Sequence, residues 1–192
     1  MKTLITTLVA AGTLFGYAAT TGSATLTAPG TMTLAASSRL WFEGTSTVKA
    51  FSCSATKFDA TVEAKTGAAP ASLVQSASLS VPVSSLDCKN GTMNDHMRKA
   101  LKAKENPEIT WRMTSYRIEG TSVAMDGFLK IAGKENPLVL RATGTTENGV
   151  VKITGSKQFR MTEFGVKPPK LMMGAMKVND PVTVRFDLVL NP

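Results

Sequence analysis

Residues 182–190 read Val-Thr-Val-Arg-Phe-Asp-Leu-Val-Leu, and this stretch near the C-terminus decides the fold. Val182, Val184, Phe186, Leu188 and Leu190 stand at every second position, with mostly polar residues between them. Side chains two residues apart point to the same face of a β-strand, so this spacing predicts a strand with one apolar face. Residues 58–65 and 109–113 repeat the pattern.

The same alternation marks further segments between residues 79 and 161. Their inward-facing sets are Leu79, Val81 and Val83; Val123, Met125, Leu129 and Ile131; Leu138, Leu140 and Ala142; and Val151, Ile153, Phe159 and Met161. Turn-forming residues separate these segments at positions 118–121, 133–137, 147–149 and 178–181. Short turns between successive strands favour antiparallel hairpins.

Residues 92–104 depart from this pattern and predict one short helix between the early and the later strands. Met93, Met97, Ala100 and Leu101 share one face of this helix, and Asn106-Pro107 follows as a stop signal. Thr92 or Asn94 is the expected N-cap, because short polar side chains satisfy the free amides of the first turn.

The chain is therefore predicted to be all-β, a closed antiparallel barrel of about eight strands with this single helix. Closure removes exposed sheet edges, and a two-sheet sandwich is the structural alternative. Residues 25–38 are mostly Thr, Ala, Ser and Gly, and they are interpreted as a flexible N-terminal stretch. The barrel domain is accordingly assigned to residues 39–192.

The first residues have the layout of a secretory signal. Lys2 supplies a positive charge, and an uncharged, mostly apolar run extends from there to Ala19. Small residues at Gly22 and Ala24 suit cleavage after Ala24, which assigns residues 1–24 to a signal peptide; a cut near Ala19 is the alternative. A retained membrane anchor would need a longer run. The mature protein is expected to be periplasmic or secreted.

Cys53 and Cys88 are the two cysteines of the chain. Thiols of exported proteins are oxidised, so a disulfide between them is expected, adding ~3 kcal/mol of stability. The alternative is a zinc or redox site, which needs closely spaced ligands, whereas these cysteines are far apart and His96 is the only histidine. No metal or cofactor is therefore expected.

The formal net charge is +8, and Lys2 leaves with the signal. Lys and Arg residues are spread along the chain, and only residues 98–104 form a dense basic group. For an exported protein, weak contact with an anionic membrane or envelope surface fits this charge better than binding to nucleic acid. A solvated basic face is the simplest interpretation.

Several motifs occur in an order that carries a family resemblance. They are Gly44-Thr45-Ser46-Thr47-Val48 followed by residues 58–62; residues 79–87; Asn94-Asp95-His96-Met97 with its exit at residues 106–111; residues 127–140; and Met161-Thr162-Glu163-Phe164-Gly165-Val166. Together they resemble the YceI-like family of exported bacterial proteins over residues 40–190. The resemblance implies a lipocalin-like barrel whose interior holds a long polyisoprenoid or similar amphiphile. It also implies that the protein can form a homodimer.

The resemblance also implies that inward-facing side chains line a ligand pocket. The residues expected there are Val62, Trp111, Met113, Leu129, Ile131, Phe159, Met161, Phe164, Val184 and Phe186. A long tail can bind without any special polar group, because each buried methylene contributes ~0.8 kcal/mol. Ordinary core packing is the alternative role for each of these residues.

His96 has three interpretations: a cap or surface role, contact with a ligand head group, or catalysis. Catalysis is poorly supported, because acid–base chemistry needs partners for the lone histidine, and no Gly-x-Ser-x-Gly elbow or phosphate-binding loop occurs. The protein is not expected to be an enzyme.

Residues 170–177 have the most unusual local composition, with methionines at Met172, Met173 and Met176. Adaptable thioether side chains suit an apolar flap over a barrel mouth. Binding of Cu(I) is the alternative, although copper sites usually recruit His or Cys nearby.

The leading hypothesis is an exported protein that sequesters or transports an isoprenoid-like lipid inside its barrel. Its rival is a non-enzymatic envelope interaction or stress-related protein whose barrel is filled by its own side chains. The interior volume of the barrel separates the two hypotheses.

Overall fold

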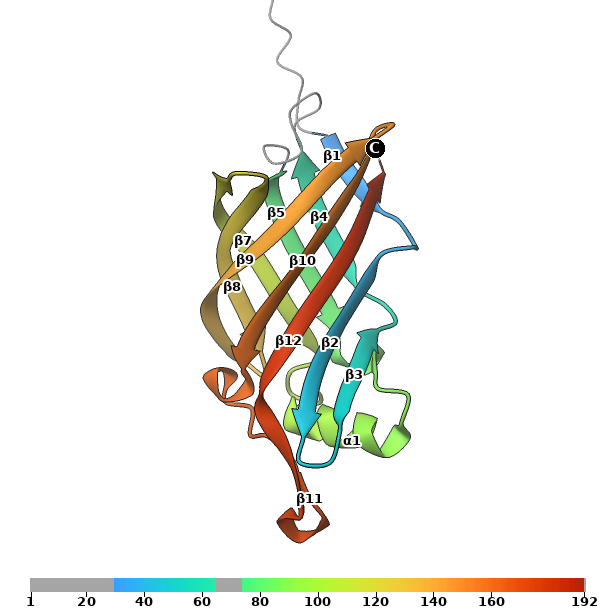
Figure 1. Cartoon of the computed structure of the whole chain (residues 1–192), viewed down its shortest axis with the longest axis vertical. Coiled ribbons are helices and arrows are strands. Elements are labelled where there is room, and N and C mark those ends of the chain that lie inside the picture. Colours follow the sequence, from blue (N-terminus) through green and yellow to red (C-terminus); the bar gives the residue numbers. More distant parts are fainter. Residues whose placement is uncertain (1–29, 65–73, 192) are drawn as a thin grey trace, which may run out of the picture.

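The computed structural model describes residues 30–64 and 74–191, which form an antiparallel β-barrel with one α-helix at its end (Figure 1). The strands are β1 Gly30–Leu34, β2 Arg39–Ser46, β3 Ala50–Ala55, β4 Asp59–Ala64, β5 Val74–Pro82, β6 Leu86–Asp87, β7 Glu108–Glu119, β8 Ser122–Ile131, β9 Lys134–Glu147, β10 Val150–Arg160, β11 Lys170–Leu171 and β12 Met176–Asn191. Helix α1 is Gly91–Ala100, and the 3-10 turns are η2 Val83–Ser85, η3 Met161–Phe164 and η4 Met172–Gly174. Within the described ranges, no helix is long and apolar enough to cross a bilayer.

The barrel has eight strand positions around its circumference. β1 and β2 are the two parts of one interrupted strand, and β3 and β4 are the two parts of the next, because β1 pairs with β4 and β2 with β3. The order continues through β5, β7, β8, β9, β10 and β12, and β12 pairs back onto both β1 and β2. The predicted closed barrel is confirmed, and the sandwich alternative is wrong.

The strand ladders are incomplete at the end of the barrel where α1 lies (Figure 1). β3 pairs there with β6 rather than with β5. β9 and β10 separate beyond the Arg141–Ser156 pair, and η3 contacts both strands, with the Asn136 amide donating to the Glu163 carbonyl at 2.7 Å. This half of the barrel is therefore held by segments packed across gaps, whereas continuous ladders surround the other half.

The N-terminal limit of the barrel differs from the prediction. β1 lies inside the stretch predicted to be flexible, yet it pairs with β4 and β12, so the barrel includes residues before Arg39. Only two apolar positions, Met32 and Leu34, mark its inward face, so the strand signal is short, and pairing on two sides supplies the structure. The predicted signal peptide, residues 1–24, lies outside the described residues.

Helix α1 starts and ends earlier than predicted. Its N-cap is Asn90, rather than Thr92 or Asn94, because the Asn90 side chain accepts a hydrogen bond from the Met93 amide at 2.9 Å. At the other end, Lys102 adopts a left-handed φ of 52°, which stops α-helical backbone before residue 104. The predicted single helix is present among the described residues, with shifted boundaries.

Buried apolar side chains fill one half of the barrel. This half lies at the end of the barrel where Figure 1 marks the C-terminus. These side chains include Val62, Val123, Met125, Ala142, Val151, Ile153 and Leu190. Partly buried Met32, Leu34 and Met113 pack against them. This half is ordinary protein core.

Candidate ligand-binding cavity

An apolar cavity of about 710 Å³ occupies the other half of the barrel. Strands from β2 round to β12 contribute its wall, and α1 lies across its end. The wall reaches the surface at Val48 and Lys49, two exposed residues of the β2–β3 turn. The volume falls within the ~300–1,000 Å³ typical of small-molecule sites. At the opposite end, the filled half of the barrel forms the floor.

Most of the residues predicted to face a ligand line this cavity. They are Trp111, Leu129, Ile131, Phe159, Met161, Phe164, Val184 and Phe186. Val62 and Met113 also belong to the interior, but they lie in the filled half and not on the cavity wall. Both belong to the correct face of their strands, so the difference is one of depth along the barrel axis.

Helix α1 presents its apolar face to the cavity. Met93, Met97, Ala100 and Leu101, the face predicted from sequence, all line the wall. No residue of α1 is fully buried, which fits a helix that packs against a hollow rather than against a filled core. His96 also lines the cavity, where a ligand head group could contact its ring.

The methionine-rich segment forms a hairpin that extends beyond the barrel at the α1 end (Figure 1). Met176 pairs with Leu171 and lines the cavity, and its role in a flap stays a prediction. Met173, with a left-handed φ of 56°, is fully exposed to solvent. The side chain of Met172 lies outside the described residues. No group of three or more His, Cys, Asp or Glu side chains in the described ranges is arranged to hold a metal ion.

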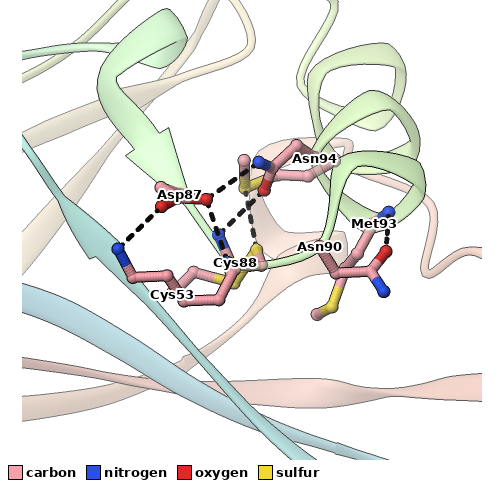
Figure 2. Close-up of a disulfide and its surroundings, with 8 residues drawn as sticks. Cys53, Asp87, Cys88, Asn90, Met93 and Asn94 are labelled. Atoms are coloured by element: carbon pink, nitrogen blue, oxygen red, sulfur yellow. Dashed lines mark hydrogen bonds and ion pairs between the residues drawn. A yellow bond between two sulfur atoms is a disulfide. The ribbon is translucent and has the colours of Figure 1, made fainter.

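The predicted disulfide between Cys53 and Cys88 is confirmed, and it borders the cavity (Figure 2). It joins β3 to the segment that leads into α1 and closes a loop with a sequence separation of 35 residues. Cys53 is completely buried. The bond therefore fixes the start of the helix to the barrel wall.

A hydrogen-bond network beside the disulfide fixes the same segment (Figure 2). The Asn94 side chain accepts from the Cys88 amide at 2.8 Å and donates to the Asp87 carboxylate at 2.9 Å. This donation, together with the Lys89 amide and ammonium groups, lowers the pKa of Asp87 from 3.8 to about 2. Asn94, predicted as a helix cap, thus links the helix to the preceding strand.

Four basic side chains line the cavity: Lys49, Lys89, Lys157 and His96. Lys89 is paired with Asp87 at 3.1 Å. Sequence reasoning missed Lys157 as an interior residue, although it has the same odd-numbered spacing as the inward-facing Val151, Ile153 and Phe159. The alternation of side chains along the strand was enough to place Lys157 inside, but lysine is ordinarily expected at the surface.

The fold and the cavity together define a lipocalin-like β-barrel with an internal apolar pocket that reaches the surface at one end. The sequence profile of the YceI-like domain matches residues 32–190. The chain therefore belongs to the YceI-like family, and the resemblance seen in its motifs is confirmed.

Solved structures share this fold at low sequence identity. BcnA from Burkholderia cenocepacia is 22% identical, with a TM-score of 0.70 over 79% of this chain and 95% of that one. A YceI protein of Campylobacter jejuni is 17% identical, with a TM-score of 0.62 over 73% and 84% of the two chains. A polyisoprenoid binding domain from Saccharophagus degradans, implicated in plant cell wall breakdown, is 13% identical, with a TM-score of 0.62 over 85% and 98%. No curated protein sequence matches this chain significantly.

Proposed function

We propose that the protein is an exported, non-enzymatic carrier that holds a long-chain isoprenoid-like amphiphile inside its barrel. The observation that carries this proposal is the cavity, which is apolar along its wall, floored by core side chains and continuous with the surface beside α1. Burial of an apolar chain there supplies the binding energy, at ~0.8 kcal/mol per methylene.

The comparisons support the chemical class of the ligand. The Saccharophagus degradans neighbour is described as a polyisoprenoid binding domain, and its fold covers 85% of this chain. A slender, flexible chain suits a barrel of this size, because eight strands leave an interior wide enough for one such ligand. The rival hypothesis, a self-filled barrel, requires side chains where the cavity lies.

Two features support export. The first residues have the charge and apolar run of a secretory signal, and the Cys53–Cys88 disulfide suits an oxidising compartment. Formation of a homodimer and weak contact with an anionic membrane surface belong to the same proposal, as routes by which cargo is sheltered or transferred.

Native mass spectrometry of the mature protein from its own host, followed by organic extraction, tests the proposal. A stoichiometric long-chain lipid is expected. An empty protein that also fails to take up added geranylgeraniol would contradict the carrier function and favour the interaction protein.

A cavity-filling variant sharpens this test. Val184 lines the cavity, so Val184→Trp should occupy the space that the tail needs and reduce geranylgeraniol uptake by about tenfold or more. Ile118→Trp is the matched control, because Ile118 is 52% exposed and lies off the cavity wall. Titration calorimetry of both variants measures the effect, and equal affinities would place the binding site outside the barrel.

A further inference from the structure

Lys157 is a cationic residue on the inward face of the barrel. On β10, Val151, Ile153 and Phe159 are buried at odd-numbered positions, and Lys157 shares their face, half-buried and on the cavity wall. Across the strands, Lys157 pairs in register with Val184, Val184 with Phe42, and Phe42 with Cys53. The lysine therefore lies in the same row of inward-facing residues as Cys53, on the cavity wall.

The Lys157 ammonium has no ion-pair or hydrogen-bond partner among residues 30–64 and 74–191. Its neighbours in this row and on its own face are apolar: Val184 across the strand and Phe159 two residues along. Lysines are rarely buried without a partner, because removing an ammonium group from water is costly. An anion brought by a ligand would offset that cost.

The charged side chains of the cavity wall have one sign. Lys49, Lys89 and Lys157 line it, and no Asp or Glu of the described ranges does. Lys49 and Lys89 are exposed, and Lys89 already pairs with Asp87, so Lys157 is the half-buried lysine of the cavity wall without an ion pair among the described residues. Low-dielectric walls strengthen the attraction of such a group for an anion.

We propose that the bound amphiphile carries an anionic head group, a phosphate or a carboxylate, which forms an ion pair with the Lys157 ammonium inside the barrel. This inference rests on the proposed carrier function and adds to it the chemical class of the head group. Apolar contacts hold the chain, and Lys157 selects acidic isoprenoids over neutral ones of the same length.

The test compares three ligands with one chain: geranylgeranyl monophosphate, geranylgeranoic acid and geranylgeraniol. Affinities for the delipidated mature protein are measured by titration calorimetry at constant ionic strength. At least one acidic ligand should bind about tenfold or more tightly than the alcohol, the value expected of one charge-assisted contact. The relative affinities of the phosphate and the carboxylate identify which anion the site prefers.

Variants assign the preference to one side chain. Lys157→Met should remove the preference for acidic ligands while keeping the affinity for geranylgeraniol, and Lys157→Arg should retain it. Lys152→Met is the matched control, because Lys152 is exposed on the outer face of the same strand. Binding of geranylgeraniol by Lys157→Met also shows that this variant folds.

Each failure has a distinct meaning. Equal binding of the alcohol and both acids by the unmodified protein would overturn the anionic head group and leave the carrier function standing. An acid preference that survives in Lys157→Met would overturn the role of Lys157. Failure of all three ligands to bind would overturn the carrier function together with this inference.

Discussion

Two inward-facing glycines allow the tips of aromatic rings to approach the barrel wall closely. Gly44 is covered by the Phe51 ring, and Gly155 is covered by the ring of Phe186, its partner on β12. Neither position needs glycine for its φ angle, because both lie in strands without positive φ. The reason for glycine is space, since a ring from the next strand packs where a Cβ would stand.

This close packing predicts that replacing glycine by alanine destabilises the fold at residue 155 but not at residue 91. A Cβ at residue 155 would overlap the Phe186 ring and lie 2.6 Å from the Arg141 carbonyl oxygen, so Gly155→Ala should destabilise the fold by ~1–3 kcal/mol. Gly91→Ala is the control, because nothing lies within 4 Å of the Cβ position at the start of α1. Urea denaturation of both variants measures the difference, and equal midpoints would refute the packing argument.

The lowered pKa of Asp87 makes part of the stability dependent on pH. The pKa of Asp87 is about 2 in the folded state, whereas its ordinary value is 3.8. The ionised carboxylate therefore stabilises the fold above pH ~4, and this contribution is lost as the pH falls from there through about 2. The melting-temperature difference between the unmodified protein and Asp87→Asn should therefore shrink between pH 5 and pH 2. Asp59→Asn, which removes an exposed carboxylate on β4, is the comparison. A difference that stays constant over this range would argue against the network around Asn94.

At the scale of elements, α1 depends on tethers more than on burial. None of its residues is fully buried, because its apolar face borders the cavity. The disulfide and the Asp87–Asn94–Cys88 network hold its first turn to β3 and β6. Helix packing is therefore the weak part of this arrangement, and covalent attachment compensates for it.

Removal of the disulfide should loosen α1 selectively. The double variant Cys53→Ser/Cys88→Ser is expected to lose ~2–5 kcal/mol of stability, since the bond closes a loop with a separation of 35 residues. Hydrogen exchange should accelerate in α1 and change little in β8 and β9, which are paired on both sides. If exchange increases uniformly, the disulfide stabilises the fold as a whole rather than anchoring the helix.

At the scale of the molecule, sequence periodicity predicted the faces of the strands well. Trp111, Leu129 and Phe186 were placed inside on parity alone, because the alternation of side chains is a local property of β-structure. Depth along the barrel axis was not predictable in this way. Val62 and Val184 have equivalent patterns, yet one lies in the filled half and the other on the cavity wall, because depth depends on how distant strands align.

Two other differences have separate causes. β1 has only two apolar inward positions, Met32 and Leu34, so it depends on pairing with β4 and β12, which the sequence does not reveal. Lys157 was not among the predicted interior residues, although its spacing places it on the inward face, because lysine is ordinarily an exposed residue. Long-range pairing was hidden in the first case, and in the second a preference of the residue type outweighed a correct local pattern.

Under the proposed carrier function, the gaps between β3 and β5 and between β9 and β10 have a consequence for the entry of a ligand. Only the core-filled half is surrounded by unbroken ladders, so the hollow half can widen without losing a single backbone hydrogen bond of those ladders. A ligand too wide for the cavity at rest could then be admitted by separation of the wall at these two gaps, while the paired strands of the filled half keep their positions.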